Sequence, residues 1–171
     1  MARLEVGDRA PDFDLSSTED VVLMLRDEVP RTAVLLYFFA DPSADGARSD
    51  LAALAARRND FARAELKVMG VSPAEMDELK SLQGELGLPF PLLRDDRDFS
   101  RGYGVAAEGE ESPPPALFLI NRDQTILWVA NPSAAAAETV DVILAQVKGL
   151  PSSTANYPRS VINRLVDLWV N

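Results

Sequence analysis

The chain has 171 residues, a net charge of −10, and neither a cysteine nor a histidine. Its 47% hydrophobic content suffices for the core of one domain. The missing residue types exclude disulfides, thiolate chemistry, Ser-His-Asp catalysis and histidine-based metal sites. The negative charge disfavours nucleic acid and anionic membranes as partners. The chain has neither an apolar run long enough to span a membrane nor an apolar signal core at the N-terminus, so we expect a cytoplasmic protein. We also expect it to need no cofactor.

Short apolar segments separated by polar turns predict the strands. They are residues 13–15, 21–25, 32–39, 65–71, 91–94, 116–120 and 126–130. The run over 32–39 does not alternate with polar residues, which is typical of a strand covered on both faces. Between 120 and 126 the polar residues indicate a hairpin.

Helices are predicted between these strands. One runs from Ser43 to about Ala64, with Ser43 or Asp45 as its cap. A second begins at a capping box formed by Ser72 and Glu75, with proline at the first helical position, and ends near residues 84–87.

The remaining helical segments are a short turn at 99–103 and a longer helix at 133–148. Residues 1–150 therefore form one domain, and 151–171 a linker followed by an amphipathic C-terminal helix. Strands interleaved with helices predict an α/β fold, a mixed sheet with helices on both faces.

Two acidic clusters raise the question of a metal or a partner. The first contains Asp95, Asp96 and Asp98, but its spacing lacks the glycine and terminal glutamate of an EF-hand loop. We expect turn and capping roles there, and no metal site. The second cluster is a proline-rich loop, for which a solvated surface is the simpler interpretation and docking of a partner the alternative. It contains Glu108, Glu110 and Glu111.

Several blocks in this order resemble the peroxiredoxins, the alkyl hydroperoxide reductase and thiol-specific antioxidant family, in particular bacterioferritin-comigratory-like members. They are Val6-Gly-Asp-Arg-Ala-Pro-Asp-Phe-Asp-Leu15, Tyr37 to Arg48, Val68 to Pro73, Phe90-Pro-Leu-Leu-Arg-Asp-Asp-Arg-Asp98 with Tyr103-Gly-Val105, and Leu117-Phe-Leu-Ile-Asn121. The resemblance implies a thioredoxin-like fold with a peroxiredoxin-type sheet.

The same resemblance implies that the catalytic groups are missing. On the family pattern Pro-x-x-x-Thr-x-x-Cys, Ala40 stands at the proline, Ala44 at the threonine and Ala47 at the peroxidatic cysteine. Pro115 stands where a family arginine is expected. Because thiol, hydroxyl and arginine are absent together, natural loss is favoured over replacement of the nucleophile alone.

What remains at this turn is charge. Asp41, Asp45 and Arg48 are interpreted first as capping and solvated charges, which helix N-termini favour. The alternative is a small polar pocket that retains a ligand.

The C-terminal segment carries a second candidate surface. Residues 158–169 place large apolar side chains on one helical face. Leu165, Val166 and Trp169 are expected to pack on their own domain, and the alternatives are a homodimer or the groove of a partner.

We therefore expect a peroxiredoxin-like domain without peroxidase activity, which acts through an unidentified protein partner or small ligand. The alternatives are an ordinary thiol peroxidase whose cysteine was replaced by engineering, and an enzyme with new carboxylate chemistry. The latter is disfavoured because no acid–base pair stands out.

Overall fold

The computed structural model describes residues 4–29, 31–95, 103–105, 115–130 and 141–146. Its strands are β1 (Asp14–Ser16), β2 (Val22–Met24), β3 (Ala33–Phe38), β4 (Leu66–Ser72), β5 (Leu92–Arg94), β6 (Ala116–Ile120) and β7 (Ile126–Ala130). Its helices are α1 (Leu25–Glu28), α2 (Asp45–Ala56), α3 (Arg58–Arg63) and α4 (Met76–Leu86). Residues 141–146 are also helical.

The strands form one sheet of five, in the order β5-β4-β3-β6-β7, and a separate hairpin of β1 and β2. Strand β3 is central: it pairs parallel with β4 and antiparallel with β6. All six residues of β3 are buried, as the unbroken apolar run predicts. This mixed sheet confirms the predicted α/β fold class.

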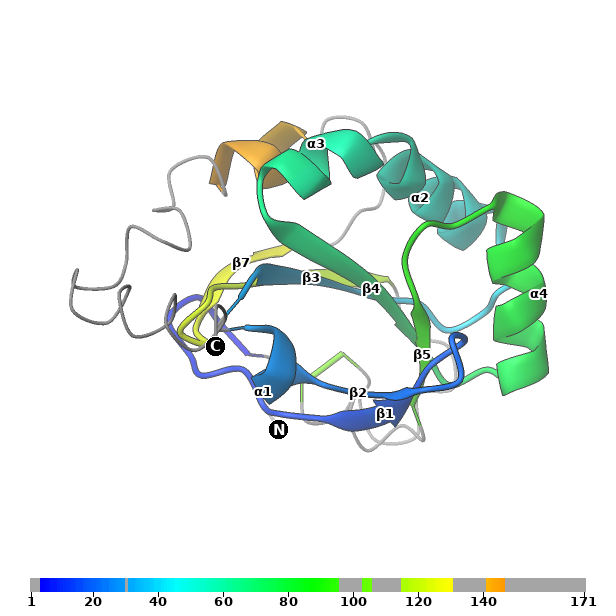
Figure 1. The fold of residues 1–171 in the computed structure, drawn as a ribbon, viewed down its shortest axis with the longest axis horizontal. Coiled ribbons are helices and arrows are strands. Elements are labelled where there is room, and N and C mark those ends of the chain that lie inside the picture. The colour runs from blue at the N-terminus through cyan, green and yellow to red at the C-terminus, as the bar shows by residue number, and fades with distance from the viewer. Residues whose placement is uncertain (1–3, 30, 96–102, 106–114, 131–140, 147–171) are drawn as a thin grey trace, which may run out of the picture.

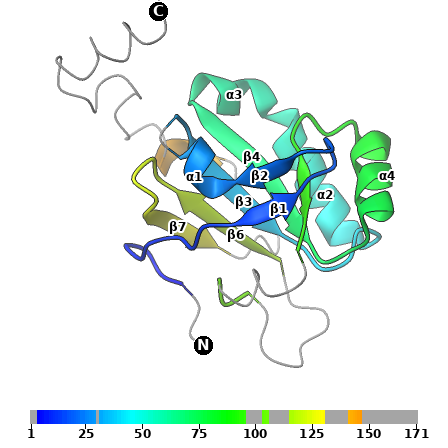
Figure 2. The same cartoon turned by 60° about the horizontal axis from the view of Figure 1, so that its bottom comes forward.

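Successive side chains of β3 point to opposite faces of the sheet and pack into two separate hydrophobic cores. Leu35 and Tyr37 belong to a core on the side of the sheet that α2, α3, α4 and residues 141–146 cover (Figure 1). Val34 and Leu36 belong to a core on the other side, which the β1–β2 hairpin and α1 cover (Figure 2). Helices thus lie on both faces, although a hairpin covers much of the second.

The predicted helix at 43–64 is wrong in its continuity, because two helices occupy this stretch. They are separated at Arg57, whose φ of −104° and ψ of 18° leave the helical range. The Arg57 side chain bonds Asp60 at 2.7 Å and Asp141 at 2.9 Å. The break therefore lies where this arginine joins the start of α3 to the helical residues 141–146.

Both predicted caps are also wrong. Helix α2 begins after Ala44, and no side chain caps it. Ser72 is the last residue of β4, and α4 begins only at Met76. The Ser72 hydroxyl instead accepts the backbone N–H of Ala74 at 3.2 Å, a local turn that competes with a capping box.

Other boundaries are closer. The end of the second helix is confirmed by Gly87, which adopts a left-handed conformation at φ 59°. The observed strand β2 ends at Met24, one residue before the predicted end. The buried Leu25 instead starts helix α1, which was not predicted. The predicted elements at 99–102, 133–140 and 147–171 lie outside the described residues.

Gly70 offers a test of this packing, because it sits in β4 under α2. A Cβ there would come within 2.5 Å of Leu92 Cδ2 and 3.2 Å of a Phe39 ring carbon. We expect Gly70→Ala to lower the free energy of unfolding by about 1–3 kcal/mol, because the buried neighbours must shift.

The matched control is Gly84→Ala on the exposed side of α4, where an added Cβ meets nothing within 4 Å. Removing a helical glycine should raise stability by about 0.5–1 kcal/mol. Urea unfolding of both variants measures the change in the free energy of unfolding, which should be negative for Gly70→Ala and positive for Gly84→Ala. Equal changes would contradict the packing described.

Candidate functional site

The candidate site lies where β3, β4 and β5 end. After β3 the chain passes through Ala40, whose carbonyl accepts the Ser72 hydroxyl at 3.4 Å. Pairing of Phe38 with Ala116 places Pro115, the residue before β6, beside this strand end. The carboxyl ends of parallel strands are a common place for binding sites in α/β proteins.

A tight turn connects this strand end to α2. The Asp41 carboxylate accepts the Ser43 backbone N–H at 2.8 Å and the Ser43 hydroxyl at 2.7 Å. These two hydrogen bonds hold the pKa of Asp41 below its usual range, and the bond from the Ser43 hydroxyl has the larger effect. Ser43 is therefore a donor to Asp41, which explains why it does not cap the helix.

The four positions that the resemblance assigns to the catalytic pattern carry no reactive side chain. Ala44 is exposed at the start of α2 and offers only a methyl group. Ala47 is 4% exposed and packs into the core on the helical side. Pro115 has neither a charge nor a backbone N–H. Ala40 contributes only its carbonyl, which Ser72 already occupies.

A recess of about 410 Å³ opens between this turn and α4. Arg48 reaches across it and pairs with Glu85 at 2.6 Å. The structure thus brings Asp41 and Arg48 to one recess, whereas Asp45 is exposed and does not line it. The lining residues are Asp41, Pro42, Ser43, Arg48, Asp77, Glu78, Ser81, Leu82 and Glu85.

The charge of this recess is negative. Four carboxylates line it, those of Asp41, Asp77, Glu78 and Glu85, against the single guanidinium of Arg48. The three carboxylates from α4 were not identified from the sequence, because nothing in their spacing shows that α4 faces the turn. A surface of this sign attracts cations and repels anions.

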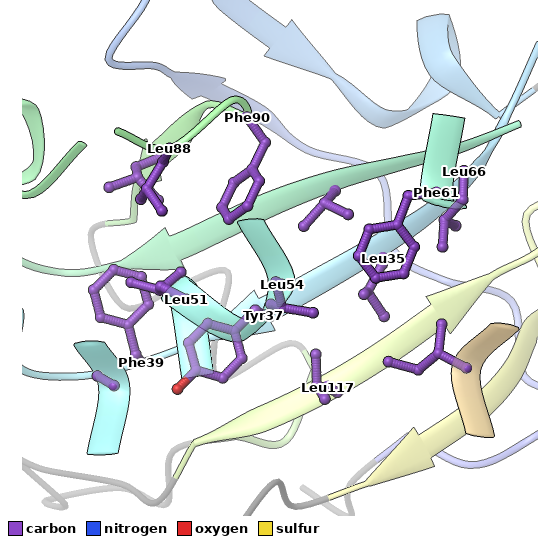
Figure 3. Packing of buried hydrophobic residues seen from close by; sticks show 14 of the residues in the cluster. Leu35, Tyr37, Phe39, Leu51, Leu54, Phe61, Leu66, Leu88, Phe90 and Leu117 are labelled. Atoms are coloured by element: carbon purple, nitrogen blue, oxygen red, sulfur yellow. The ribbon is translucent and has the colours of Figure 1, made fainter. Parts of the chain in front are cut away.

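Sequence reasoning also missed a partly buried polar pair between β3 and α2. The Tyr37 hydroxyl donates to Asp50 at 2.7 Å (Figure 3 shows the tyrosine). Burial raises the pKa of Asp50 and outweighs the opposing effect of the hydroxyl. The available signal was position: Asp50 lies on the helical face that Ala47 and Leu54 bury.

This pair predicts a pH dependence of stability. Because the pKa of Asp50 is higher in the folded state than in the unfolded state, protonated Asp50 stabilises the fold. This stabilisation is complete below the pKa of the unfolded state, about 3.9, and is lost as pH rises through the pKa of the folded state. Asp50→Asn is neutral throughout and can still accept the Tyr37 hydroxyl. We therefore expect its unfolding free energy, relative to wild type, to rise between about pH 3 and pH 7.

Chemical unfolding at several pH values measures this difference. Asp45→Asn is the control, because Asp45 is exposed on the same helix and should show no such rise. A constant difference for Asp50→Asn would refute the assignment.

Of the acidic cluster after β5, the structure describes only Asp95. Asp95 is 1% exposed, and its backbone N–H donates to the Ser72 carbonyl at 2.9 Å. Asp96, Asp98 and the glutamates Glu108, Glu110 and Glu111 lie outside the described residues. Among described residues, no three acidic side chains meet in a way that could hold a metal.

None of the described helices is both long and apolar enough to cross a membrane.

Comparison with known proteins identifies the family whose sequences this chain resembles. The sequence profile of the AhpC/TSA family matches residues 6–129. A candidate peroxiredoxin of Mycobacterium tuberculosis is 34% identical over 107 residues, which cover 62% of this chain and 68% of that protein. Peroxiredoxin 2 of Picrophilus torridus is 25% identical over 163 residues, 91% of this chain and 79% of that protein.

Solved structures show the same fold. The crystal structure of peroxidoxin BcpB from Mycobacterium tuberculosis superposes with a TM-score of 0.80 at 20% identity, over 88% of this chain and 100% of that one. The bacterioferritin comigratory protein of Xanthomonas campestris gives a TM-score of 0.71 at 21% identity, over 80% and 90% of the two chains. The predicted thioredoxin-like, peroxiredoxin-type fold is confirmed.

Proposed function

The chain belongs to the AhpC/TSA family, and we propose that it is a member that has lost thiol-peroxidase chemistry and acts as a non-catalytic binding protein. One observation carries this proposal. The position that matches the peroxidatic cysteine is Ala47, a buried methyl group, and the whole chain contains no cysteine that could replace it. Peroxide reduction by this family needs a thiolate nucleophile.

The surroundings of Ala47 support the same proposal. In the family a threonine hydroxyl and an arginine help to bind and polarise the peroxide, and Ala44 and Pro115 supply neither group. Arg48 is still present, but it pairs with Glu85.

The recess suggests what a ligand would look like. A volume of about 410 Å³ is within the range of small-molecule sites. Its excess of carboxylates favours a positively charged group, on a small molecule or on a partner protein. Asp77 and Glu78 are exposed on α4 and are available to such a group.

An ordinary peroxidase whose cysteine was replaced by engineering is the alternative. It is disfavoured because Ala44 and Pro115 also depart from the family pattern. The intact mass of the protein isolated from its source decides: the mass of this sequence supports natural loss, and a mass that reveals a cysteine refutes it. A cytoplasmic location and self-association stay predictions.

The first functional prediction concerns turnover. The purified protein should not consume hydrogen peroxide or alkyl peroxides with thioredoxin or dithiothreitol as reductant, because it has no group that can be oxidised to a sulfenic acid and recycled. Stopped-flow kinetics measure this, with buffer as the blank and an active peroxiredoxin as the positive control. Turnover clearly above the buffer rate contradicts the proposal.

The second prediction concerns reversion. Ala47→Cys should react with peroxide more than tenfold more slowly than an active family member, a barrier difference of at least about 1.4 kcal/mol. The physical reason is that Ala44 and Pro115 cannot polarise the peroxide. The rate of peroxide reduction across pH measures this effect. A rate within tenfold would show that only the nucleophile was lost.

The third prediction concerns the ligand. Titration with putrescine, a small diamine, should shift backbone NMR signals of residues 41–48 and 77–85. The paired change Asp77→Asn and Glu78→Gln should abolish these shifts. The paired change Glu19→Gln and Asp27→Asn removes the same charge from exposed positions outside the recess and should preserve them.

Shifts spread evenly over the acidic surface, or shifts that the recess pair leaves unchanged, would refute a cation site. That result would leave the loss of peroxidase chemistry untouched, because the turnover measurement tests it separately.

A further inference from the structure

A second hollow lies on the helical side of the sheet, beside the first half of β4, and we call it the α3 groove. It measures about 180 Å³. Phe61 of α3 and Phe90, from the turn before β5, stand along β4 in Figure 3. Leu54, Leu66 and Val68 complete its apolar wall, and Arg58 lies at its rim.

The groove exists because β5 is short. Strand β5 pairs only with Gly70 to Ser72, so no strand of the described chain runs beside the first half of β4 on that side. The turn with two prolines at 89–91 diverges from β4 instead. A volume of about 180 Å³ is smaller than typical small-molecule sites of about 300–1,000 Å³. It suits one or two large apolar side chains of a polypeptide.

The chain itself leads toward this groove. Ile143, in the helical residues 141–146, packs in the same core as Leu54 and Phe61. Asp141 pairs with Arg57 at 2.9 Å, and Arg57 directly precedes the groove residue Arg58. The helical residues 141–146 thus lie next to α3 (Figure 1).

The polypeptide after this point is long enough to reach the groove. Residues 147–157 can span about 36–40 Å at ~3.3–3.6 Å per residue. The groove begins close by, because Asp141 contacts Arg57 and the next residue, Arg58, lines the groove. Residues 158–169 then supply large apolar side chains at helical spacing. These are Val161, Ile162, Leu165, Val166, Leu168 and Trp169.

We propose that residues 158–169 dock in cis on the α3 groove and place Leu165 and Trp169, one helical turn apart, against Phe61 and Phe90. Attachment through a short linker gives a high effective concentration, so even weak apolar contacts keep the segment bound to its own molecule. The groove and the acidic recess are separate surfaces that share no lining residue. This inference therefore does not depend on the proposed function.

The test uses the absence of cysteine, because introduced cysteine pairs report proximity without any background. The pair Ala62→Cys and Leu168→Cys joins an exposed groove residue of α3 to the C-terminal segment. Under mild oxidation at low protein concentration, we expect an intramolecular disulfide at least tenfold faster than in the control pair, Glu19→Cys with Leu168→Cys. Glu19 is exposed in the turn between β1 and β2.

Non-reducing mass spectrometry separates the outcomes. Adding Trp169→Ala to the groove pair should lower its rate toward that of the control, and equal thermal melting of the variants shows that all are folded. Arg58→Cys with Leu168→Cys serves as a second groove pair. Equal rates in groove and control pairs overturn the proposal. A predominance of disulfide-linked dimers also overturns it, and assigns the groove to the C-terminal segment of a second copy.

Discussion

The structure depends on covering both faces of β3. All six of its side chains are buried, so it needs a layer of helices on one face and the β1–β2 hairpin with α1 on the other. Strands β4 and β6 pair with its two edges, and the chain that leaves Phe38 turns out of the sheet and continues as α2. The first turn of α2 then packs on the same core, which is why Ala47 is buried.

This constraint explains what the sequence could predict. The apolar segments that fill the two cores are continuous in sequence, so five strands of the sheet were located within two residues of their observed ends. Caps were predicted wrongly because Ser43 and Ser72 have nearer partners, Asp41 and the backbone of Ala74. Arg57, at the break between α2 and α3, pairs with Asp141, 84 residues away in the chain, and no local pattern reveals this contact.

The candidate site also has a part that the sequence predicted and a part that it did not. The strand pattern places Ala40 and Pro115 near the same end of the sheet, because Phe38 pairs with Ala116. The negative sign of the recess could not be predicted, since it comes from α4. Glu85 lies 37 residues from Arg48 and pairs with it only because α2 and α4 pack side by side. The partly buried pair of Tyr37 and Asp50 was missed although the sequence held a signal for it, because Asp50 shares a helical face with Ala47 and Leu54.

The scaffold can lose its chemistry without losing its fold, because the two rest on different atoms. Stability comes from the cores on either side of β3, and none of the four departures from the family pattern, at Ala40, Ala44, Ala47 and Pro115, removes a large apolar side chain from them. A methyl group fits the buried position of Ala47 at the start of α2 about as well as a small thiol would. Catalysis, in contrast, needs specific polar groups at that one turn. A family fold therefore constrains where a site lies, and only the side chains at that site determine what it does.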